Sequence, residues 1–247
     1  MTELLRYGDH VDQVVDLREP AEEPVGVAVL VHGGYWRARF TRDLMDPLAE
    51  DLVGRGWAVA NIEYRRVGPG AGWPEILADA RAAVDLVVAE VREREWSRPV
   101  VAVGHSVGGQ LALLTVDRGL DAVVALAPVT DLARARDEHL GEDAVLELLS
   151  ASPQQEPTVC VAGSPLSHLP VGAPVLVVHG DADTRVPLDH SQEYARCARQ
   201  AGDDVELVTL PGVDHLALID PARAWWAEIL GWMTGQAHSC STRGISR

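Results

Sequence analysis

The chain has 247 residues and is 47% hydrophobic, so it is long and apolar enough for one large α/β domain with a substantial core. Asp and Glu number 37 against 21 Lys and Arg, and the formal net charge of −16 argues against nucleic acid or an anionic membrane surface as the partner. The three cysteines are widely spaced and form no C-x-x-C motif, which argues against a disulfide framework or a zinc site.

Apolar runs and helical periodicity alternate along the chain. In the first half we predict strands at 11–17, 26–31 and 57–62, a helix at 41–54 with Thr41 as its N-cap, and a helix at 74–94 with Pro74 in its first turn. In the second half we predict strands at 100–103, 122–127, 174–178 and 205–210, and helices at 110–116, 189–201 and 221–233. Alternating β and α segments with continuous apolar strands predict an α/β fold, with a mostly parallel sheet covered by helices on both faces.

Two segments depart from this rhythm. Residues 128–172 are rich in charge, Pro and Ser, and they carry one short helical pattern at 144–149. The whole segment is too long for an ordinary loop. We predict that they form a small cap inserted after a central strand, and the alternative is a disordered surface excursion. The main domain is expected to span 1–236, and the polar residues 237–247 are expected to be a disordered tail.

The sequence Gly104-His105-Ser106-Val107-Gly108 is the most informative motif of the chain. It is a G-x-S-x-G motif between a buried strand at 100–103 and a helical stretch at 110–116, which is the context that a nucleophile elbow requires. A side chain at Gly104 or Gly108 would collide with the neighbouring strand or helix. The motif therefore predicts that Ser106 is raised at the C-terminal edge of the sheet as a nucleophile.

A serine nucleophile needs a general base, and we choose His215 for this role. It follows the strand at 205–210, in a loop at the same edge of the sheet as Ser106. The other histidines have no spacing that indicates a metal site, and we predict neither metal nor cofactor. We expect packing roles for His105 and His179.

Several carboxylates are candidates for the acid that orients this histidine. Asp183 is the first choice, because it follows the strand at 174–178 at the same edge. Asp181 is the second, although it is better suited to hold the turn by accepting backbone N–H groups. Asp131 follows the strand at 122–127 and is a third option. Asp214 is adjacent to His215, and on an extended backbone it points elsewhere.

Glycines at the end of the strand at 26–31 predict an oxyanion hole. The backbone N–H groups of Gly34 and Tyr35, with that of Val107, would face a substrate oxygen and stabilise its developing charge. His32 lies inside this turn, and we expect its ring to brace the loop rather than to act as the base.

Four motifs in this order carry a resemblance to a known family. They are His-Gly-Gly-Tyr-Trp at 32–36, Gly-His-Ser-Val-Gly-Gly at 104–109, Gly-Asp-Ala-Asp-Thr-Arg-Val-Pro at 180–187 and Asp-His at 214–215. Across roughly residues 20–235 the chain resembles the α/β-hydrolase superfamily, and more narrowly its esterase/lipase branch with an H-G-G-x-W loop, which includes kynurenine formamidases (arylformamidases). The resemblance implies triad roles for Ser106, Asp183 and His215. In the segment after the next strand, Glu63 and Arg65 are interpreted as structural pairing.

The predicted function is that of a cofactor-free serine hydrolase acting on a small ester or amide through an acyl-enzyme. Arylformamidase activity on N-formyl-kynurenine is the most concrete version, and a carboxylesterase for short-chain or aryl esters is the alternative. A third possibility is a non-catalytic small-molecule-binding protein on the same fold. Tyr35, Trp36 and Trp73 are candidates for stacking on a substrate, or they are ordinary packing residues.

The N-terminal segment shows no basic stretch followed by an apolar core, and no apolar run approaches the ~20 residues that span a bilayer. We therefore expect a cytoplasmic protein with no membrane partner. The sequence leaves monomer and homodimer open.

Overall fold

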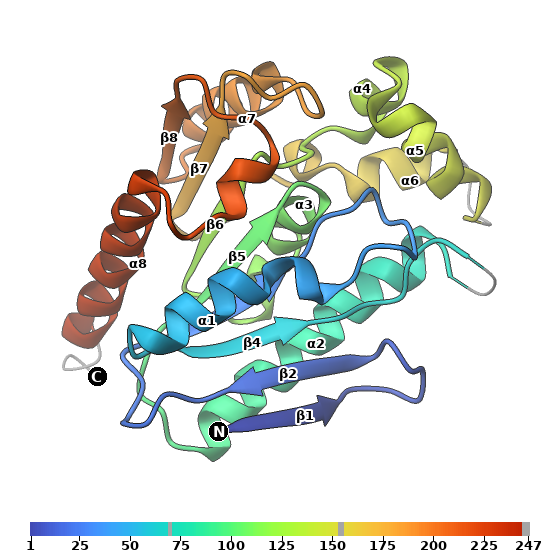
Figure 1. Ribbon diagram of the computed structural model, residues 1–247. Helices are drawn as coiled ribbons and strands as arrows, with labels where there is room; N and C mark the ends of the chain where they lie inside the picture. Colours follow the sequence, from blue (N-terminus) through green and yellow to red (C-terminus); the bar gives the residue numbers. More distant parts are fainter. Residues whose placement is uncertain (69–70, 153–155, 244–247) are drawn as a thin grey trace.

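The computed structural model describes residues 1–68, 71–152 and 156–243, and within these a single eight-stranded sheet runs through the molecule (Figure 1). Its strand order is β1-β2-β4-β3-β5-β6-β7-β8, antiparallel where β2 meets β1 and β4 and parallel from β4 to β8. The strands are β1 Thr2–Arg6, β2 Val14–Arg18, β3 Val27–Val31, β4 Ala58–Ile62, β5 Val100–His105, β6 Ala122–Leu126, β7 Val175–Gly180 and β8 Val205–Leu210. The α/β prediction with a mostly parallel sheet is confirmed.

The continuous apolar strands predicted from the sequence form the centre of this sheet. Every residue of β3, β4, β5 and β6 is buried, as expected for parallel strands covered on both faces. β1 was not predicted, because it is a largely exposed edge strand whose polar residues lack an alternating pattern.

Helices cover both faces of the sheet. Residues of α1 (Asp46–Gly54) and α8 (Ala224–Arg243) pack in the core cluster on one face, and those of α2 (Trp73–Glu93), α3 (Val107–Leu113) and α7 (Leu188–Ala201) pack on the other. Pro74 lies in the first turn of α2 as predicted. The helix expected from Thr41 begins instead with a 3₁₀ turn at Arg42–Met45, and the Thr41 side chain makes no capping hydrogen bond to the part of the chain that is described. Further 3₁₀ turns lie at Val116–Arg118, Pro165–His168 and Leu216–Ile219.

The insertion after β6 is a helical cap. It contains α4 (Leu132–Asp137), α5 (Leu140–Ser150) and α6 (Glu156–Gly163), which lie side by side beyond the C-terminal ends of the central strands (Figure 1). The prediction of a cap in this region is thus correct, but it anticipated only one of these helices. Apolar side chains that interrupt the polar sequence bind the cap to the main core: Leu132, Leu148 and Val159 are fully buried.

The predicted disordered tail is wrong as far as Arg243, because α8 continues to that residue. No glycine or proline lies between Gly235 and Arg243, so nothing in the sequence stops the helix there. The remaining tail residues, 244–247, lie outside the described part of the chain. None of the helices described is both long enough and apolar enough to cross a membrane.

Candidate active site

Ser106 occupies the tight turn between β5 and α3. Its φ of 57° and ψ of −121° are far from the ordinary regions for a residue with a side chain, and strain of this kind clusters at functional sites. A Cβ at Gly104 would lie 2.2 Å from the carbonyl oxygen of Gly108, and a Cβ at Gly108 would lie 2.0 Å from that of Val31. The expected reason for both glycines is therefore confirmed. The helix begins at Val107, three residues earlier than the pattern indicated.

The loop after β3 lies directly against Ser106. A Cβ added to Gly33 would come within 3.1 Å of the Ser106 Cβ and 2.9 Å of the His105 carbonyl oxygen, so only glycine permits this approach. The Ser106 backbone N–H donates to the carbonyl oxygen of Leu126 at 2.8 Å, which ties the turn to β6. The Ser106 residue is only 2% exposed.

Asp183 and His215 meet at the ends of β7 and β8. His215 Nδ1 lies 2.6 Å from Asp183 Oδ2, and the carboxylate is completely buried. The second oxygen of Asp183 accepts the N–H groups of Arg185 at 2.8 Å and Val186 at 3.0 Å. Burial alone would raise the pKa of Asp183, but hydrogen bonds from His179 and His215 outweigh it and hold that pKa well below its usual range. The carboxylate is therefore ionised and fixed in orientation.

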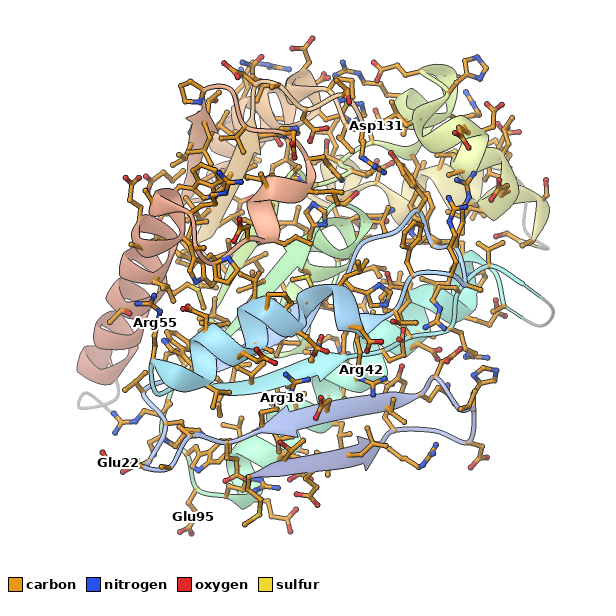
Figure 2. The ribbon with its side chains drawn as sticks, viewed as in Figure 1. Arg18, Glu22, Arg42, Arg55, Glu95 and Asp131 are labelled. Atoms are coloured by element: carbon orange, nitrogen blue, oxygen red, sulfur yellow. The ribbon has the colours of Figure 1, made fainter. Side chains whose placement is uncertain are left out.

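The other carboxylates considered from the sequence have structural partners. Asp181 Oδ1 accepts the N–H of Gly212 at 2.6 Å and ties together the loops after β7 and β8. Asp131 lies at the start of α4, in the upper part of the view (Figure 2), and its side chain accepts two N–H groups of that helix. Asp214 caps the following 3₁₀ turn by accepting from two of its N–H groups. Of the four carboxylates Asp131, Asp181, Asp183 and Asp214, only Asp183 forms a hydrogen bond with His215.

His105 connects the elbow to His215. Its Nε2 donates to the His215 carbonyl oxygen at 2.9 Å, and the two imidazole rings are 4.5 Å apart. Burial lowers the pKa of His105 to about 3, and the neighbouring His215 adds to the shift. His105 is thus a neutral residue at neutral pH, with the packing role that the sequence indicated, and it ties His215 to the Ser106 turn.

The backbone of residues 34–36 is unusual at each position. Gly34 has a φ of 117°, Tyr35 of 54° and Trp36 of 59°, so this loop turns sharply beside Ser106. Val107 is the first residue of α3, and its N–H is one of the four that have no acceptor within the helix. The donors predicted for an oxyanion hole therefore belong to a strained loop and a helix N-terminus that flank the serine.

A buried polar network holds the loop, and sequence reasoning had captured only part of it. The His32 ring lies 2.7 Å from the Gly33 carbonyl oxygen and 2.9 Å from the Glu63 carboxylate, which confirms its bracing role. The same ring stacks on Tyr64, whose hydroxyl donates to the His32 carbonyl oxygen at 2.9 Å. Glu63 also pairs with Arg66. Burial raises the pKa of Glu63, but the hydrogen bond with His32 and the positive charge of Arg66 outweigh it and keep that pKa below the ordinary value.

The sequence indicated structural pairing for Glu63 and Arg65, and both form ion pairs, but not with each other. Arg65 pairs with Asp79 on α2, with Nε 2.7 Å from the carboxylate. One signal in the sequence could have identified the His32–Glu63 pair. Each residue directly follows a buried strand, and these two strands, β3 and β4, are parallel neighbours in the sheet.

The three aromatic side chains expected to stack on a substrate have different surroundings. Trp36 is 1% exposed and donates from Nε1 to Gln110 at 3.1 Å, and Trp73 is 2% exposed in the same core cluster. Core packing thus accounts for both indoles, and the structure does not support substrate stacking by either. Tyr35 lines a cleft of about 510 Å³ with Arg37, Arg39 and Arg185, which sequence reasoning had not singled out.

The cap meets the loop after β3 at one close contact. A Cβ on Gly141 would lie 2.3 Å from the Tyr35 ring, so the α5 backbone approaches the ring as only glycine allows. Gly141, Glu142 and Asp143 all have positive φ values between 57° and 64°, a left-handed turn inside the first part of α5. The wall of the cleft is therefore made jointly by the cap and the loop after β3.

Known proteins with similar sequences and folds agree with this architecture. Esterase LipC of Mycobacterium tuberculosis is 28% identical over an alignment that covers 88% of this chain and 60% of LipC, so the chain spans less than two thirds of that relative's length. A truncated carbohydrate esterase from gut microbiota has a TM-score of 0.80 at 19% identity, covering 96% of each chain. The propionate-bound esterase Est2 of Thermogutta terrifontis has a TM-score of 0.70 at 25% identity, covering 92% of this chain and 94% of Est2.

These structural likenesses and the mostly parallel sheet show an α/β-hydrolase fold. The family model described as BD-FAE matches residues 15–197, which is most of the chain and includes Ser106 and Asp183. The chain belongs to the BD-FAE family.

Proposed function

We propose that this protein is a serine carboxylesterase. The observation that carries the proposal is the 2.6 Å hydrogen bond between His215 Nδ1 and a buried, ionised Asp183, at the same sheet edge as the strained Ser106 turn. An aspartate in this position fixes the tautomer of the histidine and stabilises the imidazolium that forms when it takes a proton.

In the proposed reaction Ser106 Oγ attacks the ester carbonyl carbon while His215 Nε2 accepts the hydroxyl proton. The N–H groups of Gly34, Tyr35 and Val107 are the proposed donors to the oxyanion, and one such donor contributes about 2.7–4 kcal/mol to the transition state. The tetrahedral intermediate collapses as His215 returns its proton to the leaving alcohol. Water then attacks the acyl-enzyme, again with His215 as base, and the acid and free serine are released.

The named relatives favour an ester over a formamide as the substrate. LipC and Est2 are both esterases by name, and Est2 holds propionate in its structure. Arylformamidase activity has the His-Gly-Gly-Tyr-Trp loop as its support, and that loop serves an ester carbonyl equally well. We therefore place a small ester first and N-formyl-kynurenine second.

The test combines active-site labelling with turnover. A fluorophosphonate probe should label the wild-type protein and fail to label Ser106→Ala, and 4-nitrophenyl acetate should be hydrolysed faster than N-formyl-kynurenine. A folded wild-type protein that neither reacts with the probe nor hydrolyses 4-nitrophenyl acetate would contradict the proposal and favour a non-catalytic binding protein. A preference for N-formyl-kynurenine by orders of magnitude would instead favour the formamidase.

A further inference from the structure

Three arginines line the cleft beside Tyr35. Arg37 and Arg39 come from the loop after β3, and Arg185 comes from the loop after β7 that also carries Asp183. The chain has a formal charge of −16, so three guanidinium groups in one cleft run against the charge of the molecule as a whole. Such a local excess of positive charge concentrates anions.

Two of these arginines have no partner that would neutralise them. Arg37 is bound bidentately by Glu147, with distances of 2.8 and 2.6 Å. Arg39 and Arg185 form no ion pair with any residue that the structure describes, and both are exposed. The guanidinium of Arg39 lies over the Phe40 ring, 4.9 Å from its centre, which limits the space that it can occupy.

The carboxylates in the same wall are fewer and partly neutralised. Glu138 is held by Arg134 at 2.6 Å and by His190 at 2.9 Å. Among the described residues that line the cleft, Glu142 is the other acidic one. Its backbone carbonyl oxygen accepts a hydrogen bond from Arg37. The charges without a counter-ion in the cleft are therefore two guanidinium groups and one carboxylate.

Arg185 is tied to the catalytic geometry. Its backbone N–H donates to Asp183 at 2.8 Å, and its carbonyl oxygen accepts from the Tyr35 hydroxyl at 3.5 Å. Burial lowers the pKa of His105 most, and the positive charge of Arg185 adds to the effect, so Arg185 lies within electrostatic reach of the elbow. The cleft is thus lined by the loop after β7, which carries Asp183, and by the loop after β3, which carries Tyr35, and it adjoins the proposed site.

We propose that this cleft is a subsite for an anionic group, and that the preferred esters carry a carboxylate bound by Arg39 and Arg185. The proposal rests on the proposed esterase function and adds a substrate class to it. A guanidinium presents several N–H donors in a plane that matches a carboxylate, and hydrogen bonds between charged groups are the stronger ones. Neutral esters lack this contact.

The test compares esters that differ only in a carboxylate and the isosteric amide. One pair is 4-acetoxybenzoate and 4-acetoxybenzamide, with the group on the leaving alcohol; the other is monophenyl glutarate and phenyl glutaramate, with the group on the acyl side. In one pair we expect kcat/KM of the wild type to be about tenfold higher for the carboxylate. The ratio should fall toward one in Arg39→Gln, in Arg185→Gln and in about 0.5 M salt.

Arg196→Gln is the matched control, because Arg196 is an exposed arginine of α7 outside the cleft, and it should keep the wild-type ratio. The direct binding of 4-hydroxybenzoate and glutarate against their amides, measured by calorimetry, gives a readout that does not need turnover. Equal rates within both pairs would remove the anion subsite and leave the esterase intact. The opposite outcome is that no ester is turned over, that the carboxylate ligands bind more tightly than their amides, and that Arg185→Gln abolishes this difference. That outcome would contradict the esterase and support the anion subsite.

Discussion

Asp183 bonds His215 through one carboxylate oxygen, at 2.6 Å, while its other oxygen closes the turn after β7. The residue that orients the proposed base is thus held by its own backbone turn. This double use explains why the carboxylate is completely buried and yet has a pKa far below the usual range, since burial is outweighed by the hydrogen bonds that it accepts.

Replacing Asp183 should therefore affect turnover far more than replacing Asp131, the candidate acid from the loop after β6. Asp183→Asn is expected to lower kcat for 4-nitrophenyl acetate by about 10³- to 10⁴-fold, because the histidine loses the partner that fixes its tautomer. The Asp131 side chain caps α4, so Asp131→Asn should change kcat little. Steady-state kinetics of both variants decide the matter: a nearly silent Asp183→Asn beside an inactive Asp131→Asn would assign the acid to the other loop.

Gly108 should tolerate no side chain. In Gly108→Ala the new Cβ would lie 2.0 Å from the Val31 carbonyl oxygen, so β3 and α3 must separate. We expect a loss of about 1–3 kcal/mol or more in the free energy of unfolding, measured by urea denaturation. Gly231→Ala is the matched control, because it lies in α8 with no described atom within 4 Å of the new Cβ, and it should gain about 0.5–1 kcal/mol. Equal stability of the two variants would refute this account of the elbow.

His105 should make the folded state sensitive to mild acid. Burial lowers its folded-state pKa from 6.5 to about 3, so between these values the unfolded chain binds a proton that the folded protein does not. Stability is therefore full above pH 6.5 and falls as the pH falls toward 3, by about 1.4 kcal/mol per pH unit for this one group.

His105→Gln keeps an N–H donor for the His215 carbonyl oxygen but cannot take up the proton, so its free energy of unfolding should depend less steeply on pH between 6.5 and 4. Urea denaturation at several pH values measures the difference. An identical slope in His105→Gln would show that the histidine takes up its proton in the folded state as well.

The Glu63 carboxylate should be essential to the stability of the loop after β3. Its side chain and that of its partner Arg66 are 3% and 8% exposed, so Glu63→Gln removes the buried counter-ion of the guanidinium and leaves it only the more exposed Asp12, at 3.2 Å. We expect a loss of about 3 kcal/mol in the free energy of unfolding, and a partial recovery when Arg66→Gln is added. Asp85→Asn breaks an exposed pair with Arg118 and should leave the unfolding midpoint almost unchanged. A Glu63→Gln variant as stable as wild type would argue against a structural role of the pair.

The sheet and the elbow were predictable because their signals are local. Ser106 lies in a five-residue motif that contains both glycines the turn needs. The strand before Asp183 begins with a continuous apolar run, and the strand before His215 has apolar residues at four of its six positions. Topology then brings the carboxyl ends of parallel strands to one edge, so position along the chain was enough to predict that the two residues meet.

Features that depend on distant contacts were not predictable in this way. Whether Trp36 faces a ligand or the core depends on Gln110, 74 residues away, and not on its own neighbours. The edge strand at Thr2–Arg6 has no buried face to impose alternation. The arginines of the cleft come from two loops that the sequence separates by about 150 residues, so their shared environment appears only in three dimensions.

The contact between Gly141 and the Tyr35 ring limits how freely this fold can be modified. Because the cap backbone touches the loop that carries the proposed oxyanion donors, the cap is not an independent module that can be exchanged for that of a relative. A graft of residues 128–172 would have to bring its own glycine at this point or a smaller residue in place of Tyr35. A substitution in the cap that widens the range of substrates is therefore expected to need a second substitution in the loop after β3 to preserve the reaction rate. Such substitutions should arise in pairs.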